Sequence, residues 1–237
     1  MGILALQGDV AEHARVLEEL GASAVLVTSI EDLAGLDGLV LPGGESTTIS
    51  MLLGTSGLAG ALSALLAEGM PAFGTCAGMI LLAREVIGGR PDQVCFGAID
   101  IVVRRNAFGR QVESFERDLR VEKLGADPFR AVFIRAPVVV QVGEGVEVMA
   151  EVEMKADGGA QGAGPPDREA QGLPGPSGGD RGEDLLRRPV LCRPVLCRQG
   201  PVMVSAFHPE LAGDLRLHDM FLSELCGRER LDCERLD

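Results

Sequence analysis

Short apolar segments alternate with helix-like segments through the first hundred residues, and this alternation constrains the fold more than any other feature of the chain. The apolar runs of strand length are residues 3–6, 24–27, 39–41 and 72–74. Residues 10–20, 58–68 and 79–84 instead repeat apolar side chains at helical spacing, and glycines follow the first two of these segments. Strands that alternate with helices predict an α/β fold with a mostly parallel central sheet and helices on both faces.

The second half of the chain changes to a succession of strand-like segments. These segments are residues 98–103, 119–121, 131–134, 138–142, 146–152 and 201–207. A helical pattern at residues 215–225 follows the last of them. We interpret residues 1–226 as a single domain.

Residues 156–200 interrupt this domain with a stretch rich in glycine and proline. Such a composition buries too little apolar surface to fold, and it predicts a disordered surface insertion. Within the stretch, residues 188–192 are repeated at once as residues 193–197, and a second short repeat makes up most of a charged tail, residues 227–237. We interpret both repeats as sequence slippage.

Composition excludes several classes of function. The chain holds 35 acidic and 22 basic residues, a net charge of −13, and its few aromatic residues are all phenylalanine, so nucleic-acid binding is not expected. Residues 46–67 lack charge but are too rich in serine, threonine and glycine for a membrane span. The N-terminus has no basic segment before Arg15, so we expect a cytoplasmic protein. A zinc site from Cys192, Cys197 and His208 matches no usual ligand spacing.

The sequence Gly74-Thr75-Cys76-Ala77-Gly78 lies where a predicted strand meets a predicted helix. Small residues at such a junction allow a tight turn that exposes the central side chain, the arrangement called a nucleophile elbow. A following helix N-terminus would activate the thiol and offer N–H groups to an oxyanion. Taken alone, the motif fits a buried structural cysteine equally well.

His208 favours the catalytic interpretation. It ends an apolar strand and is followed by Pro209 and Glu210. In an extended backbone His208 and Glu210 would point the same way, so that the carboxylate orients the imidazole and the imidazole deprotonates a thiol. The other histidines, His13 and His218, lie on predicted helices and are expected to face solvent or pack.

A third motif, residues 42–47 (PGGEST), follows a buried strand and opens a helical stretch. Its Gly43-Gly44 turn can present backbone N–H groups to an oxyanion or another anion, or it can be an ordinary strand–helix turn. The motif lacks the lysine of a phosphate-binding loop, which disfavours nucleotide binding.

Together, these three motifs resemble class I (triad) glutamine amidotransferases. More narrowly, the chain is similar to the glutaminase subunit of pyridoxal 5'-phosphate synthase. The segments that carry this narrower likeness are residues 5–8 (ALQG) with 12–13 (EH), 105–111 (RNAFGRQ) and 133–137 (FIRAP). The likeness covers residues 1–155 and 200–226; the insertion and the duplicated tail depart from the family pattern. It implies a flavodoxin-like three-layer fold.

The resemblance also implies an activity, the hydrolysis of L-glutamine to L-glutamate and ammonia. Cys76 would attack the side-chain amide, His208 would move the proton and Glu210 would fix the imidazole. The implied oxyanion donors are the backbone N–H of Ala77 and one of Gly43 or Gly44. The family's glutamine-binding positions fall on Gly44, Glu45, Ser46, Arg105, Ile134 and Arg135.

The implied partner is a synthase subunit that takes up the ammonia to make pyridoxal 5'-phosphate, within a large hetero-oligomer. No metal or bound cofactor is expected in this chain. Two alternatives stay open on sequence alone. One is the glutaminase of another pathway, such as imidazole glycerol phosphate synthase, against which residues 105–111 and 133–137 argue. The other is a non-catalytic binding subunit that kept the fold, which a broken triad would mark.

Overall fold

The computed structural model describes residues 1–105, 114–155 and 190–227. The chain divides into a large unit of residues 1–152 and 193–237 and a small unit of residues 153–192. In the small unit, the described residues are the adjoining ends of two strands.

The central sheet has seven strands in the order β10-β11-β12-β4-β3-β1-β2. In chain order their bounds are β1 Gly2–Leu4, β2 Val25–Val27, β3 Leu39–Leu41, β4 Ala72–Thr75, β10 Glu147–Lys155, β11 Val190–Gln199 and β12 Val202–Ser205. Strands β2, β1, β3, β4 and β12 are parallel neighbours, while β11 runs antiparallel to β12. The predicted mostly parallel sheet is confirmed.

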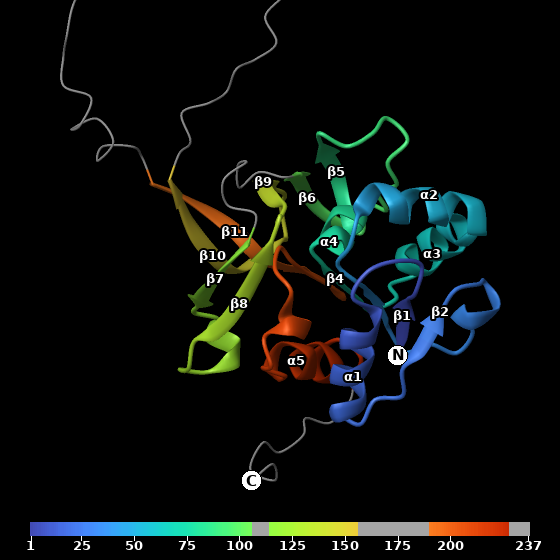
Figure 1. Ribbon diagram of the computed structural model, residues 1–237, viewed down its shortest axis with the longest axis horizontal. Coiled ribbons are helices and arrows are strands. Elements are labelled where there is room, and N and C mark those ends of the chain that lie inside the picture. The colour runs from blue at the N-terminus through green and yellow to red at the C-terminus, as the bar shows by residue number, and fades with distance from the viewer. Residues whose placement is uncertain (106–113, 156–189, 228–237) are drawn as a thin grey trace, which may run out of the picture. The chain divides into compact units, whose positions relative to one another are not determined.

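Helices cover both faces of this sheet (Figure 1). Their bounds are α1 Val10–Glu19, α2 Ser46–Ser56, α3 Leu58–Ala67, α4 Ala77–Leu82 and α5 Arg216–Glu224. Side chains alternate along β4: Phe73 packs against His218 and Phe221 of α5, whereas Gly74 faces Gly78 of α4. Helices α5 and α4 therefore lie on opposite faces, and α1 lies beside α5 through the His13–His218 ring contact.

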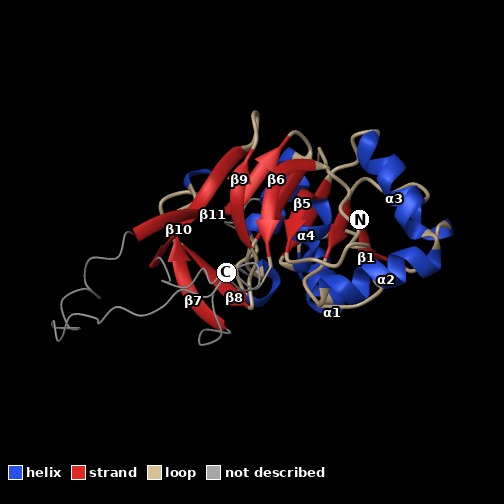
Figure 2. Ribbon diagram, turned by 90° about the horizontal axis from the view of Figure 1, so that it is seen from above, coloured by secondary structure: helices blue, strands red, loops and turns tan. Residues whose placement is uncertain are grey.

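Two smaller sheets are built from strands that follow α4 in the chain (Figure 2). One contains β5 (Ala83–Ile87), β6 (Ile99–Arg104) and β9 (Val138–Val142), and the other pairs β7 (Ser114–Leu119) with β8 (Phe129–Ile134). Short 3₁₀ turns complete the described elements: η1 at Glu31–Leu33, η2 at Glu122–Leu124 and η4 at Pro209–Leu211.

Two predicted elements differ from the structure. The helix predicted over residues 79–84 ends at Leu82, and Ala83 begins β5 by pairing with Ile99 of β6. The strand predicted over residues 119–121 is only the end of β7, because the chain turns into η2 directly after Val121. At Ala83 the boundary is set by pairing with β6, which local periodicity does not reveal.

The prediction of disorder across residues 156–200 is wrong for residues 190–199, which form β11. The strand pairs with β12 and buries Val195, Leu196 and Cys197. Most of the repeated segment thus became a strand because its neighbours β10 and β12 supplied pairing that composition cannot anticipate. The rest of the predicted insertion, residues 156–189, and the predicted tail, residues 228–237, lie outside the described residues.

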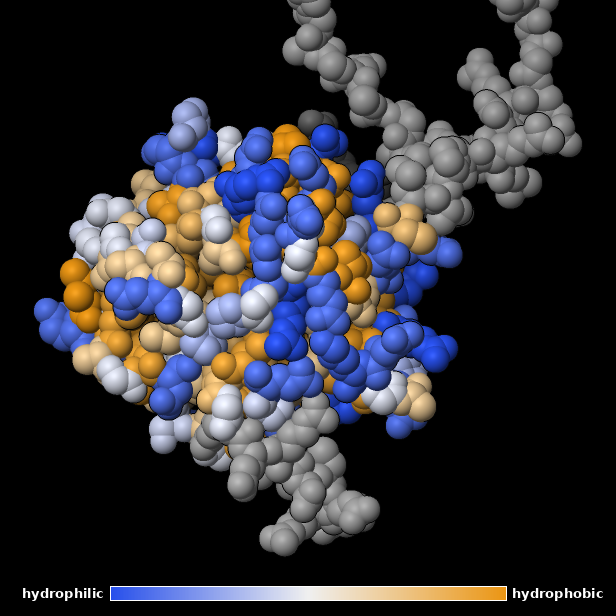
Figure 3. Space-filling view, turned by 180° about the vertical axis from the view of Figure 1, so that it is seen from behind, coloured by the Kyte–Doolittle hydropathy of each residue, from blue (hydrophilic) through white to orange (hydrophobic). Residues whose placement is uncertain are grey.

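Within the described ranges, no single helix is long and apolar enough to cross a membrane; α2 and α3 pass that test only jointly, and they are bent by 99° at their break. Hydrophilic and hydrophobic side chains are interspersed on the face in Figure 3. The large hydrophobic residues that are exposed come from several elements: Val25, Leu26, Ile30, Met51, Ile87, Val148 and Leu211.

Candidate active site

Cys76 occupies the sharp turn between β4 and α4. Its φ of 49° and ψ of −98° lie in a region that residues with a side chain rarely adopt. The strain is held in place because the Cys76 N–H donates to the Ser205 carbonyl at 2.8 Å. A Cβ on Gly78 would collide with the Leu41 carbonyl, so only glycine lets α4 lie this close to β3. The predicted nucleophile elbow is present.

His208 and Glu210 come together as predicted, although by a different backbone. Pro209 opens the 3₁₀ turn η4, so the segment is not extended. The His208 Nδ1 lies 2.8 Å from the Glu210 Oε1, and the His208 N–H donates to the Val132 carbonyl at 2.8 Å. Glu210 is 1% exposed and sits behind the imidazole. The carboxylate thereby fixes the ring with its Nε2 available to Cys76.

Asp9 is a second carboxylate at the same imidazole, since its Oδ2 lies 3.2 Å from the His208 Nδ1. Burial would lower the pKa of His208, but interactions with Asp9, Cys76 and Glu210 outweigh it and raise that pKa. Burial raises the pKa of Glu210, and His208 opposes this effect. The site therefore favours a proton on His208.

A pocket of about 330 Å³ opens beside these groups. It is lined by Gln7, Gly8, Asp9, Gly44, Glu45, Ser46, Cys76, Ala77, Ile80, Arg105, Ile134, Arg135, Pro137 and His208. Most of the residues expected to bind glutamine or carry the chemistry are therefore brought together. Gly43 is not in the lining; it packs against the His208 ring, which a Cβ at this position would strike.

Glu45 and Arg105 form an ion pair at the edge of this pocket. The Arg105 guanidinium donates to the Glu45 Oε1 at 2.8 Å and to the Thr47 Oγ1 at 2.7 Å. Glu45 also caps α2, because its carboxylate accepts from the Thr47 and Thr48 N–H groups at 3.2 and 2.7 Å. Partial burial raises the pKa of Glu45, but these hydrogen bonds lower it to about 2. The carboxylate is thus fixed as an anion.

Three further expected residues, Ser46, Ile134 and Arg135, line the same pocket. The Cys76 Sγ lies 3.9 Å from the carbonyl of Ile134, and Arg135 follows with a φ of 44°. Arg135 is one of two non-glycine residues with positive φ in the described chain, and the other is Cys76. The Ser46 Oγ is buried and has no hydrogen-bond partner among the described residues, so a ligand could supply one.

Sequence reasoning assigned no role to Gln7, Asp9 and His13. The Gln7 Oε1 accepts from the Glu45 N–H at 2.8 Å, so it holds the turn that begins α2. A signal was available for Gln7 and Asp9, because they follow β1 at the carboxyl edge of a parallel sheet, where ligands bind. His13 and His218 were expected either to face solvent or to pack in the interior. Both are fully buried, so they pack in the interior.

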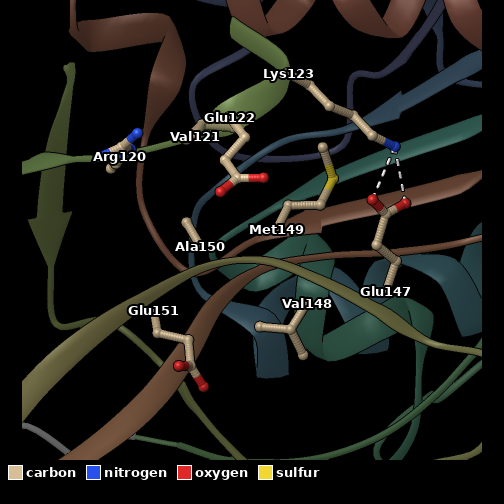
Figure 4. Close-up of a pocket in the computed structure, with 9 residues that line it drawn as sticks. All are labelled: Arg120, Val121, Glu122, Lys123, Glu147, Val148, Met149, Ala150 and Glu151. Carbon is tan, nitrogen blue, oxygen red and sulfur yellow. Dashed lines mark hydrogen bonds and ion pairs between the residues drawn. The ribbon is translucent and has the colours of Figure 1, made fainter. Parts of the chain in front are cut away.

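A second hollow of about 520 Å³ lies between η2 and β10 (Figure 4). Its lining residues are Arg120, Val121, Glu122, Lys123, Glu147, Val148, Met149, Ala150 and Glu151. Lys123 and Glu147 form an ion pair across it at 2.8 Å. None of these lining residues is a cysteine, serine or histidine, so the smaller pocket around Cys76 is the candidate active site.

Among the described residues, ligand atoms of Asp9, His208 and Glu210 lie within 4.8 Å of one another, as a metal site would require. The atom that both carboxylates approach is the His208 Nδ1. A cation bound there would replace the proton that these hydrogen bonds need. The arrangement therefore suits the orientation of an imidazole better than the binding of a metal ion.

The chain is similar to curated proteins called pyridoxal 5'-phosphate synthase subunit PdxT. The one from Frankia casuarinae is 50% identical over 225 residues, covering 95% of this chain and 94% of that protein. The one from Rhodococcus jostii is 47% identical over 227 residues, covering 96% and 97%.

Solved structures agree with these relatives. A crystal structure described as a glutamine amidotransferase is 44% identical, with a TM-score of 0.74 over 96% of this chain and 98% of that one. The Thermotoga maritima PurLQS structure shares the fold at 15% identity, with a TM-score of 0.58 over 94% of this chain and 97% of that one. The model of the SNO glutamine amidotransferase family matches residues 3–163. The chain belongs to the SNO glutamine amidotransferase family.

Proposed function

We propose that this chain is the glutaminase subunit of a pyridoxal 5'-phosphate synthase, and that it hydrolyses L-glutamine with Cys76, His208 and Glu210. The observation that carries the proposal is the strained Cys76 in the lining of the pocket, together with His208, whose Nδ1 lies 2.8 Å from the buried Glu210 carboxylate. Family membership and the relatives named PdxT support the same activity.

In the first half of the reaction the Cys76 thiolate attacks the side-chain amide carbon of glutamine. The carbonyl oxygen becomes an oxyanion, which the N–H of Ala77 and one N–H of Gly43 or Gly44 would stabilise. His208 carries the thiol proton on Nε2 and gives it to the amide nitrogen. The carbon–nitrogen bond then breaks, and ammonia leaves behind a thioester on Cys76.

Water completes the cycle. His208 removes a proton from a water molecule, whose oxygen attacks the thioester carbon. The carbon–sulfur bond breaks, glutamate is released and the proton returns to the Cys76–His208 pair. Glu210 stays ionised throughout and stabilises the imidazolium.

The substrate requires groups for an α-ammonium and an α-carboxylate as well as for the amide. Arg105 and Arg135 in the pocket lining supply positive charge for the carboxylate, and the Glu45 side chain supplies acceptors for the ammonium. Gly44, Ser46 and Ile134 complete the proposed glutamine site.

The partner we propose is a synthase subunit that receives the ammonia, assembled with this chain in a large hetero-oligomer. Glycine turns such as Gly43-Gly44 hold more than one backbone conformation at little cost, so contact with the partner can select the one that completes the oxyanion site. We therefore expect weak glutamine hydrolysis by the isolated chain and a large rise in kcat when the synthase subunit is added.

A glutaminase assay with and without the synthase subunit tests the proposal. Glutamate should form only with the intact triad, and ammonia should be retained when the sugar-phosphate substrates are present. A parent chain that forms no glutamate in either condition would exclude a glutaminase. Full activity that the partner leaves unchanged would exclude coupling to the synthase.

A further inference from the structure

A buried cluster of polar side chains lies directly behind the triad. The His13 Nε2 is 3.4 Å from the Glu210 Oε2 and 3.2 Å from the Thr75 Oγ1, and the His13 Nδ1 is 3.1 Å from the His218 Nε2. All four residues are at most 1% exposed. Helices α1 and α5, which carry the two histidines, lie side by side below the sheet in Figure 1.

The hydrogen-bonding requirements of these groups select one arrangement of protons. If His13 carries its proton on Nε2, it donates toward Glu210 and Thr75, and its bare Nδ1 accepts from the His218 Nε2–H. The opposite arrangement turns a bare His13 Nε2 toward the carboxylate and leaves a buried N–H on the His218 Nδ1, which has no partner among the described residues. An unsatisfied buried donor is costly, so the first arrangement is favoured.

Both histidines in this chain of donors are uncharged. Burial first, and then the charges of His218 and His208, lower the pKa of His13 well below 6.5. Burial lowers the pKa of His218 to about 3. The cluster therefore places an uncharged imidazole beside Glu210 and adds no positive charge there, so the charge of the Glu210 carboxylate stays available to His208.

We propose that His13 is a positioning residue, which donates from its Nε2 to the outer oxygen of Glu210 and keeps that carboxylate ionised and aimed at His208. The Glu210 Oε1 lies 2.8 Å from the His208 Nδ1. The buried Glu210 Oε2 has no hydrogen-bond partner among the described residues, and the His13 Nε2, 3.4 Å away, is placed to supply a donor with a small turn of its ring. His218 fixes which nitrogen of His13 carries the proton. This inference rests on the proposed function only where it is tested by glutamine kcat and KM.

Loss of the His13 donor should act on the charge of Glu210. The titratable groups that face Glu210 are His13, His208 and, beyond the imidazole, Asp9, whose negative charge opposes ionisation of Glu210. Without the donor the pKa of Glu210 rises further, so its carboxylate becomes neutral at a higher pH. His208 then loses its counter-charge and holds its proton less firmly, so it becomes a weaker partner for the Cys76 thiol.

The test compares His13→Leu, which removes the donor, with His13→Gln, whose amide nitrogen restores one at a similar distance. Leu62→Ala in α3 is the control, because it removes a fully buried side chain that has no part in the cluster. Peptide-resolved alkylation of Cys76 by iodoacetamide is followed against pH on the full chain. Glutamine kcat and KM are measured with the synthase subunit present.

For His13→Leu we expect the Cys76 alkylation curve and the acidic limb of kcat/KM to move up by about 1 to 2 pH units. At the parent's optimum kcat should fall about 10- to 100-fold, with little change in KM, because His13 does not line the pocket. His13→Gln should reverse most of the pH shift and most of the fall in kcat. Leu62→Ala should leave the pH dependence of Cys76 alkylation and of kcat/KM unchanged.

The inference is overturned if His13→Leu keeps the parent's alkylation curve, or if His13→Gln is as impaired as His13→Leu. Alkylation needs no glutamine hydrolysis, so a parent without glutaminase activity would refute the proposed function and still leave the role of His13 measurable.

Discussion

Replacement of Glu45 by alanine tests whether this residue is mainly a helix cap or mainly a substrate ligand. In the structure its carboxylate accepts from the N–H groups of Thr47 and Thr48 and pairs with Arg105. The pKa of Glu45 falls from 4.5 to about 2, which would correspond to roughly 3 kcal/mol for a fully buried group. The side chain is 41% exposed, so solvent screening reduces this figure, and an N-cap is worth about 1 to 2 kcal/mol.

For a chain of 237 residues, a loss of about 1 to 2 kcal/mol lowers Tm by about 2 to 8 °C. The pH dependence has a definite sign. Because the folded pKa of Glu45 is depressed, its stabilisation is complete above pH 4.5 and is lost as pH falls through about 2. The difference in Tm between parent and Glu45→Ala should therefore be full near neutral pH and shrink in acid.

The matched control is Glu68→Ala, which removes the same charge from an exposed position just after α3. Thermal melts of parent and both variants give the comparison, and glutamine KM is measured on the same samples. Equal Tm values for the two variants near neutral pH would refute the capping argument. If the Tm difference between the parent and Glu45→Ala did not shrink in acid, the negative charge of Glu45 would have no part in the stabilisation. A raised KM at an unchanged Tm would make Glu45 chiefly a substrate ligand.

Other expected outcomes follow from the site and the sheet. Cys76→Ser should abolish glutamine hydrolysis, and a glutamine-analogue alkylator should label Cys76 and no other cysteine by peptide mass spectrometry. Arg105→Ala and Arg135→Ala should each raise the glutamine KM or lower kcat/KM while circular dichroism stays unchanged; parental kinetics in both would remove them from the binding site. Deletion of residues 158–198 should prevent folding, because it takes most of β11 with three buried side chains, each worth about 1.5 to 3 kcal/mol. Deletion of residues 158–187 leaves β11 whole, and its melting curve should stay near that of the parent.

The sequence alone determined the layers of the fold and pointed to Cys76, His208 and Glu210 as the candidate catalytic residues. Both are encoded over short distances along the chain. The period of the apolar residues separates β1, α1 and β3 without any knowledge of their partners. The elbow at Cys76 needs only small residues between a strand and a helix. Glu210 reaches His208 because only one residue, Pro209, separates them in the sequence.

Only the tertiary structure decided what surrounds the triad. His13 meets Thr75 across 62 positions and His218 across 205, and no local pattern reports such contacts. The repeated segment shows the same limit. Side chains alternate between the two faces of a strand, so residues five positions apart point to opposite faces. Cys192 is accordingly exposed, while Cys197, its equivalent in the second copy of the repeat, is buried. The two cysteines of the repeat thus received different environments, because pairing with the neighbouring strands β10 and β12, and not composition, turned residues 190–199 into a strand.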